Sequence, residues 1–186
     1  MKKLYSLICG ALVLSALLFG GCAKLSGLVP GSKAESGAPS KASEGQISFE
    51  GTDLKGNKVT GEIFSQSKLT MVNVWATYCN PCLREMPELG ELSAEYKKEE
   101  FQIIGIVSDV MEGNDQTLVE SLVQQTGADY THLLLNESLY NALLTDVSAV
   151  PTTFFLDENG EVLDTVIGAM EKSAWEEKIN ELLGKN

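Results

Sequence analysis

The chain has 186 residues, of which 44% are hydrophobic and 22% are charged, a composition that supports one packed domain and argues against disorder throughout. Its 26 acidic and 14 basic residues give a formal net charge of -12 at pH 7. A surface of that sign repels polyanions, which excludes nucleic acid as a partner bound through its phosphates. The four cysteines, at positions 9, 22, 79 and 82, are too few to form a stabilising disulfide framework in a chain of this length, so each is interpreted separately.

Residues 1–21 have the pattern of a secretory signal peptide. A short basic start precedes an apolar run at 4–19, which is shorter than the about 20 residues that a membrane span needs. The run ends at Gly20-Gly21-Cys22, which resembles the lipobox of bacterial lipoproteins. We therefore expect residues 1–21 to be removed and Cys22 to become the acylated first residue; an uncleaved N-terminal anchor is the alternative. Both place the rest of the chain outside the cytoplasm, anchored to the bacterial cell membrane.

Residues 22–45 predict a flexible, lipid-anchored linker. They consist mainly of Gly, Ser, Ala, Pro and Lys, so they cannot bury enough apolar surface to become ordered. As a coil, such a segment spans on average roughly 25 to 30 Å. The domain that follows, residues 46–186, would therefore be held above the bilayer.

From residue 46 onward the pattern becomes that of an α/β domain. Segments 46–50 and 58–62 flank turn-forming residues and predict an added N-terminal β-hairpin. Dense apolar runs at 69–76 and 101–107 predict central parallel strands that are buried on both faces. Between them, apolar residues recur every three or four positions over 81–98, which predicts an amphipathic helix. The result is a strand-helix-strand unit.

A second helix and a third strand are predicted next. Asn114 or Asp115 can cap a helix that ends near residue 126, and residues 131–135 can form the strand. The inward face of this helix is expected to hold Leu118, Leu122 and Val123.

The chain is predicted to end in a β-hairpin and a helix. Segments 152–156 and 162–167 flank a turn that contains Asn and Gly, which tolerate positive φ. Ser173 and Glu176 predict a capping box for the last helix, and Gly184 would close it. The order of elements predicts a central mixed sheet with an antiparallel edge, flanked by helices.

Cys79 and Cys82 stand where the first central strand gives way to its helix. Pro81 would occupy the first helical position, N1, where its missing N–H costs nothing. Cys79 would then lie against free backbone N–H groups at the positive end of the helix dipole, which favours the nucleophilic thiolate. Cys82, one helical turn later, could attack a mixed disulfide formed at Cys79. The spacing predicts an attacking and a resolving sulfur.

A zinc site and a static structural disulfide are the two alternatives to redox catalysis by the cysteine pair. A zinc site would need further ligands, but the mature chain has no second pair and its sole histidine is His132, so no metal is predicted. A static disulfide is compatible with an oxidising compartment. No cofactor is predicted beyond the redox-active disulfide, because the sequence has no phosphate loop or haem attachment signature.

Two separated motifs resemble those of the membrane-anchored, thioredoxin-like proteins of the TlpA/ResA group. They are VWATYCNPC at 74–82, followed by Glu85-Met86-Pro87, and VPTTFFLD at 150–157. The likeness covers about residues 46–183 and implies a thioredoxin-like fold and a thiol-disulfide oxidoreductase. It also implies that Pro151 is a cis proline beside the sulfurs and that Val150 offers backbone groups to an extended substrate.

The resemblance extends to residues around the cysteines. Tyr78, where tryptophan is commoner, would shape the substrate-binding surface, and Trp75 is assigned to the same region, packed under the active-site turn. Asn73 aligns with a buried aspartate of the wider family and cannot exchange a proton. Glu85 matches a glutamate of the ResA-type site and lies one turn after Cys82, so it is the candidate acid/base. The alternative is that Glu85 is an exposed acid near the helix start.

The predicted function is reduction of disulfides in exported proteins, of the cytochrome c maturation type, by a monomer. The resemblance implies two partners, which are disulfide-containing exported substrates such as apocytochrome c and a membrane thiol donor of the CcdA/DsbD type. One alternative is a thiol oxidase that forms disulfides in exported proteins. The other is a redox-silent binding module on the same fold.

Overall fold

The computed structural model describes residues 47–185. The predicted signal peptide (1–21), Cys22 and the predicted linker (22–45) lie outside the described residues, so their assignments stay predictions. Within the described part, no helix combines the length and the apolar character that crossing a bilayer requires.

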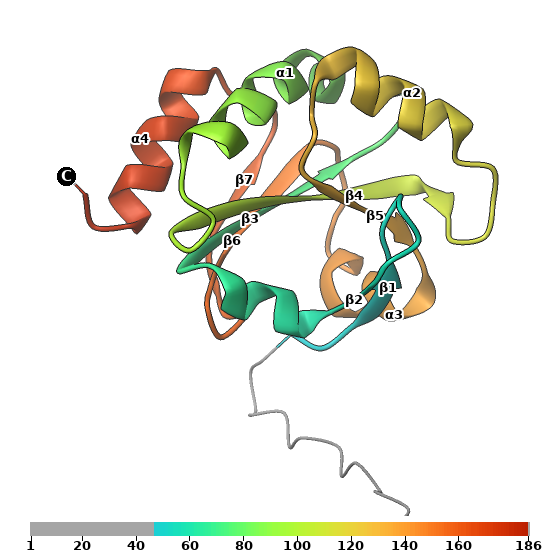
Figure 1. Cartoon of the computed structure of the whole chain (residues 1–186), viewed down its shortest axis with the longest axis horizontal. Helices are drawn as coiled ribbons and strands as arrows, with labels where there is room; N and C mark the ends of the chain where they lie inside the picture. Colours follow the sequence, from blue (N-terminus) through green and yellow to red (C-terminus); the bar gives the residue numbers. More distant parts are fainter. Residues whose placement is uncertain (1–46, 186) are drawn as a thin grey trace, which may run out of the picture. The chain divides into compact units, whose positions relative to one another are not determined.

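A five-stranded mixed sheet forms the centre of the domain, in the order β5-β4-β3-β6-β7 (Figure 1). Its strands are β3 (Leu69–Trp75), β4 (Phe101–Met111), β5 (Thr131–Leu135), β6 (Thr152–Asp157) and β7 (Val162–Ile167). β3, β4 and β5 run parallel, whereas β6 is antiparallel to both β3 and β7. The predicted mixed sheet with an antiparallel edge is confirmed. β4 differs from its prediction, since it continues to Met111 instead of ending at Val107.

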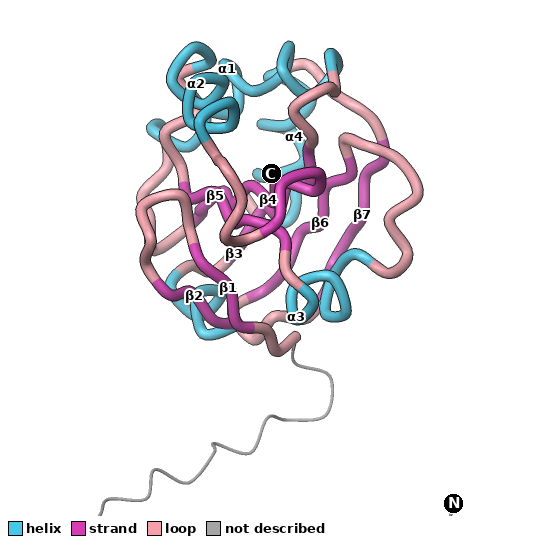
Figure 2. The backbone as a smooth tube through the Cα atoms, turned by 90° about the vertical axis from the view of Figure 1, so that its right-hand side faces the viewer, coloured by secondary structure: helices cyan, strands magenta, loops and turns pink. Residues whose placement is uncertain are grey.

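Helices cover one face of this sheet, and shorter elements cover the other (Figures 1 and 2). The first group is α1 (Asn80–Glu95), α2 (Thr117–Thr126) and α4 (Lys172–Leu182). The second group is the 3-10 helix η1 (Gly61–Gln66), the helical turn α3 (Glu137–Leu139), its π-helical continuation η2 (Tyr140–Leu144) and a strand pair.

The alternating direction of the side chains along β3 explains why a hydrophobic core lies on each face of the central sheet. Successive side chains of a strand point to opposite faces. Met71 and Trp75 accordingly pack under the helices, while Val72 and Val74 join the core on the other side. All seven residues of β3 are buried, as expected for a central strand.

The N-terminal strand pair consists of β1 (Glu50–Thr52) and β2 (Lys58–Thr60), which run antiparallel. The added hairpin is therefore confirmed, although β1 begins near the end of the segment predicted for it. Gly61 starts η1 and does not extend β2, because the Thr60 side chain accepts a hydrogen bond from the Glu62 N–H and caps the helix. The pair joins the main sheet through Leu54, whose N–H donates to the His132 carbonyl at 3.1 Å.

Two helix predictions need correction. α2 begins at Thr117, so its buried position is Val119, whereas Leu118 is 58% exposed. The predicted capping box of α4 is absent, because Ser173 lies inside the helix and the N-cap residue makes no side-chain bond. The Lys172 N–H instead donates to Glu88 of α1 at 2.5 Å, so a neighbouring helix satisfies this end of α4.

Candidate active site

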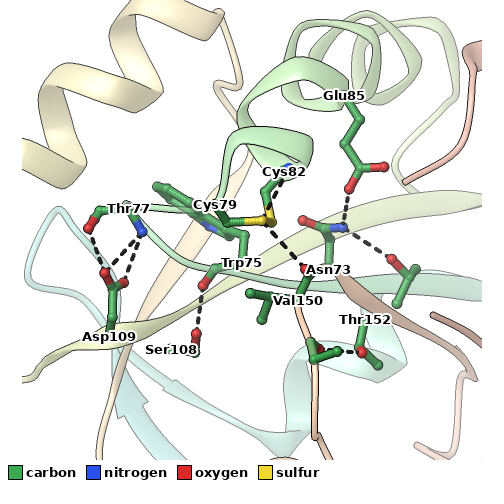
Figure 3. The surroundings of a disulfide bond; sticks show 12 residues. Asn73, Trp75, Thr77, Cys79, Cys82, Glu85, Ser108, Asp109, Val150 and Thr152 are labelled. Carbon is green, nitrogen blue, oxygen red and sulfur yellow. Dashed lines mark hydrogen bonds between the residues drawn. A yellow bond between two sulfur atoms is a disulfide. The ribbon is translucent and has the colours of Figure 1, made fainter. Parts of the chain in front are cut away.

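Cys79 and Cys82 form a disulfide at the start of α1. Cys79 is the N-cap residue of this helix, and its Sγ accepts a hydrogen bond from the Cys82 N–H at 3.3 Å (Figure 3). The two cysteines differ in access, since Cys79 keeps 5% of its surface exposed and Cys82 keeps none. A partner that approaches from solvent can therefore reach Cys79 but not Cys82.

Pro81 occupies the second position of α1 and not the first, which was predicted for it. Because Cys79 is the N-cap, Asn80 is the first helical residue and Pro81 is the second. Proline is tolerated there for the reason given for the first position, since the N–H of the second residue also has no acceptor inside the helix.

The turn that precedes Cys79 is held by β4. The Asp109 carboxylate accepts hydrogen bonds from the Thr77 N–H at 3.1 Å and from the Thr77 hydroxyl at 2.5 Å (Figure 3). Next to it, the Ser108 hydroxyl donates to the Trp75 carbonyl at 2.9 Å. The extension of β4 beyond Val107 therefore fixes the backbone on the N-terminal side of Cys79.

The segment before β6 closes the other side of the sulfur pair. The Val150–Pro151 peptide bond is cis, and the Val150 carbonyl oxygen lies 3.6 Å from Cys79 Sγ. Tyr78 is 73% exposed, and it shares with Val150 the lining of a groove of about 270 Å³. The structure thus brings Tyr78, Val150 and Cys79 together at one surface.

Trp75 does not belong to that surface. Its side chain is fully buried, and its indole N–H donates to His132 Nδ1 at 3.2 Å. The other ring nitrogen of His132 lies 2.8 Å from the Ala128 carbonyl oxygen. Burial lowers the pKa of His132 to about 4, so the ring is neutral and can accept from Trp75. The predicted packing of Trp75 under the active-site turn is confirmed, whereas its assignment to substrate binding is wrong, because its side chain lies in the core.

The close approach of His132 to β4 depends on a glycine. A Cβ atom at Gly105 would overlap His132 Nδ1. The two residues are register partners on neighbouring strands, β4 and β5. A missing side chain on one strand therefore makes room for the imidazole on the next.

Glu85 lies on α1 and points inward toward β3 (Figure 3). It is only 3% exposed, which contradicts the alternative of an exposed acid. Its Oε1 accepts from Asn73 Nδ2 at 3.0 Å, and its Oε2 accepts from the Met170 N–H at 3.2 Å. Burial raises the pKa of Glu85 to about 7, against the opposing effect of these hydrogen bonds. A carboxyl with this pKa can both take up and release a proton near neutral pH.

The sequence interpretation did not identify two residues of this site, Asp109 and Thr153. Asp109 was expected to lie beyond the end of its strand, and no local pattern links it to Thr77. Thr153 stands in the second motif, and its hydroxyl accepts from Asn73 Nδ2 at 3.1 Å.

In the part of the chain from 47 to 185, no three His, Cys, Asp or Glu side chains gather as they would around a metal ion.

Comparison with known proteins assigns the family. The model of the Redoxin family matches residues 33–183. The chain belongs to the Redoxin family. It is 34% identical to the thiol-disulfide oxidoreductase ResA of Geobacillus kaustophilus over 122 residues, which are 65% of this chain and 66% of that protein. It is 30% identical to ResA of Bacillus thuringiensis over 128 residues, 69% of this chain and 70% of that one.

A solved structure supports the fold alone. It is a thioredoxin family thiol:disulfide interchange protein from Chlorobium tepidum, with a TM-score of 0.64 and 22% identity, covering 79% of this chain and 100% of the other. The thioredoxin-like fold and the ResA-type family that the two motifs implied are both confirmed. This Redoxin family member is a thiol-disulfide oxidoreductase whose Cys79 and Cys82 form the CxxC pair.

Proposed function

We propose that this protein reduces disulfide bonds in exported proteins, with Cys79 as the attacking and Cys82 as the resolving sulfur. The observation that carries the assignment of roles is the unequal access to the two cysteines, because only Cys79 keeps any exposed surface. The Cys82 N–H, which now contacts Cys79 Sγ, would also stabilise a thiolate at that atom.

The reaction proceeds in two exchanges. The Cys79 thiolate attacks one sulfur of the substrate disulfide, so a mixed disulfide forms and the other substrate sulfur leaves as a thiolate. Cys82 then loses its proton and attacks Cys79 Sγ, which releases the second substrate thiolate. Two electrons pass to the substrate, and Cys79 and Cys82 are left as the disulfide seen in the structure.

Glu85 is proposed as the group that accepts the proton of Cys82. It lies three residues after Cys82 on α1, and residues at this spacing share a helix face. Its pKa of about 7 lies between that of an ordinary carboxylate and that of a thiol, which suits transfer in both directions.

The substrate is proposed to bind as an extended segment beside Val150, whose backbone borders Cys79. The neighbouring groove is lined in part by Tyr140, Leu144 and Val147, so it suits an apolar side chain that flanks the substrate cysteine. Tyr78 also lines this groove, so it is proposed to shape the substrate-binding surface.

The proposal includes a partner that returns electrons to the pair. A membrane dithiol donor of the CcdA/DsbD type would reduce the Cys79–Cys82 disulfide by the same two exchanges in reverse. No further cofactor is needed, because the two sulfurs carry both electrons. We propose that the protein acts as a monomer without nucleic acid, and that cytochrome c maturation is the process served.

The extracytoplasmic location is supported by the signal-like run at 4–19 and by Cys22 after it. Substitution of Cys22 by alanine is expected to move the protein from the membrane fraction to the soluble fraction of cells. The matched control is Cys9→Ala, since Cys9 lies in the segment predicted to be removed, and we expect it to leave the distribution unchanged. Full retention of the Cys22→Ala protein in membranes would contradict lipid anchoring at this residue.

The direction of transfer is tested by the reduction potential of the Cys79/Cys82 pair. For a reductase we expect a value below about -250 mV, near the thioredoxin value of about -270 mV. A value near the about -120 mV of a strong oxidant would overturn the proposal and favour the thiol oxidase. The redox-silent binding module is set aside, because the chain belongs to a family of thiol-disulfide oxidoreductases.

A further inference from the structure

The amide of Asn73 lies between Glu85 and the neighbouring strand β6. Its Nδ2 donates to Glu85 Oε1 at 3.0 Å (Figure 3). The same Nδ2 donates to Thr153 Oγ1 at 3.1 Å. Asn73 and Thr153 are direct register partners on β3 and β6, so the backbone fixes this arrangement. Both hydrogens of the amide nitrogen are therefore used within the core.

The oxygen of the same amide has no partner. Asn73 is fully buried, yet its Oδ1 makes no hydrogen bond. Buried polar atoms nearly always have a partner, so an unpaired one at a reaction site calls for an explanation. This oxygen is an acceptor at the end of an amide whose other end contacts an ionisable carboxyl.

Two further buried atoms without a partner belong to residues near the same carboxyl. They are Tyr130 OH and Trp175 Nε1. The Trp175 indole is close enough to lower the pKa of Glu85, although its N–H lies outside hydrogen-bonding geometry, and the Glu85 charge raises the pKa of Tyr130. Within residues 47–185, the buried side-chain atoms that lack partners thus belong to residues around Glu85.

Charged groups also face Glu85 from the elements packed against it. Glu88, on the same helix, raises the pKa of Glu85 through its like charge. Arg84 and Glu171 line the opening of about 450 Å³ that Glu85 borders. Among the described residues, however, only Asn73 and Met170 donate hydrogen bonds to the carboxyl. Met170 donates from its backbone, so Asn73 supplies the one side-chain contact.

We propose that Asn73 is a positioning residue that serves both protonation states of Glu85, donating through Nδ2 to the carboxylate and, after a half-turn of its amide, accepting through Oδ1 from the carboxylic acid. This role rests on the proposed function, in which Glu85 exchanges a proton with Cys82. During that exchange the S–H bond of Cys82 breaks and an O–H bond forms on Glu85. The electron pair stays on the sulfur, and Asn73 itself gains and loses nothing.

The chemistry of Thr153 makes the half-turn feasible. A hydroxyl can accept from Nδ2 or donate to Oδ1, so Asn73 keeps two hydrogen bonds in either orientation. An aspartate at position 73 could not do this, because its charge would repel the Glu85 carboxylate. The unpaired Oδ1 is then the acceptor that the protonated state of Glu85 uses.

The experiment is a titration of the Glu85 carboxyl by carbon NMR in the oxidised protein, with and without Asn73→Leu. Leucine has a similar volume but neither a donor nor an acceptor, so both protonation states of Glu85 lose a hydrogen bond. Because the bond to the charged carboxylate is the stronger of the two, we expect the titration midpoint to rise by about one pH unit. The pH profile of thiol-disulfide exchange should shift in the same direction. Thr153→Val keeps Asn73 but removes its second partner, and we expect a smaller shift of the same sign; this variant also covers the case in which Asn73→Leu does not fold.

The matched control is Thr70→Val. Thr70 is also buried on β3 and accepts a hydrogen bond from Gln102 Nε2 at 2.9 Å. This variant is expected to lower stability without moving the Glu85 midpoint. An unchanged midpoint in Asn73→Leu and Thr153→Val would overturn the positioning role, even if Glu85→Gln shows that Glu85 is needed. If Glu85→Gln leaves the exchange profile unaltered, the proposed proton transfer fails instead, and the NMR midpoint still decides the inference on Asn73.

Discussion

Replacement of Cys79 by serine is expected to slow the reduction of a substrate disulfide about a thousandfold or more. The reason is that the remaining sulfur, on Cys82, has no exposed surface in the structure. A serine hydroxyl in place of Cys79 would not be ionised near neutral pH, so no nucleophile would stand at the surface. The rate is measured by single-turnover reduction of a disulfide peptide by the pre-reduced protein.

Cys82→Ser is the matched control for that variant. It loses the same Cys79–Cys82 disulfide, so a general effect of the missing cross-link on stability is common to both. It keeps Cys79, the more accessible of the two cysteines. We expect the Cys82→Ser protein to attack the peptide but to stop at the mixed disulfide. Equal loss of the first exchange in the two variants would show that the cross-link and not the position of the sulfur matters.

Glu85→Gln is expected to slow the resolving step about 100-fold near neutral pH, because a positioned acid/base contributes about that factor or more. Glu85 must be ionised to accept the Cys82 proton. The wild-type rate should therefore rise with pH through about 7, the pKa to which burial raises this carboxyl. The variant should lose this rise and follow only the ionisation of the thiols. Stopped-flow kinetics from pH 5 to 9 measure both.

The same pKa shift predicts how stability depends on pH. Below about 4.5 the carboxyl is protonated in the folded and the unfolded chain, and it contributes nothing. Between about 4.5 and about 7 the folded state holds the proton more tightly, so the contribution of Glu85 to stability falls as the pH rises. The lowered pKa of His132 acts in the opposite direction, equally in the wild type and in a Glu85 variant. The total loss from this group is roughly 3 kcal/mol by pH 8. Glu85→Gln should remove that decline, as measured by urea unfolding of the oxidised protein at pH 5 and pH 8.

The control for both readouts is Glu91→Gln. Glu91 lies on α1 as well, but its side chain is 63% exposed and pairs with Lys172. Such an exposed pair contributes little, so neither the rate profile nor the pH dependence of stability should change. A Glu85→Gln protein with the wild-type rise in rate through pH 7 would contradict a proton-transfer role.

Much of the fold could be predicted because hydrophobic patterns repeat over several residues. The continuous apolar runs gave two parallel strands, and the helical spacing between them gave α1 within a few residues of its observed ends. The short helical segment 137–144 was not predicted, since it has only one α-helical turn before its π-helical part. A signal existed in Asn136, whose side chain accepts from the Leu139 N–H at 2.8 Å as an N-cap.

The site was predictable where its residues are neighbours in the chain. Cys79, Cys82 and Glu85 lie within the first two turns of one helix. Spacing therefore predicted the two cysteines, and spacing together with the family resemblance predicted Glu85. The contacts of Asn73 with Thr153 and of Trp75 with His132 join strands that are far apart in the sequence. They depend on the register of the sheet, which a single sequence does not specify. Trp75 packs under the active-site turn as predicted, but its inclusion among the substrate-binding residues is wrong, because the contact with His132 that holds it in the core could not be predicted.

The most direct test of the account is to find which cysteine joins the substrate. Each single-serine variant is mixed with an oxidised peptide, and the covalent adducts are identified by intact mass and peptide mapping. We predict a mixed disulfide on Cys79 in the Cys82→Ser protein and no adduct in the Cys79→Ser protein. An adduct that forms on Cys82 at a comparable rate would contradict the assignment of Cys79 as the sulfur that meets the substrate.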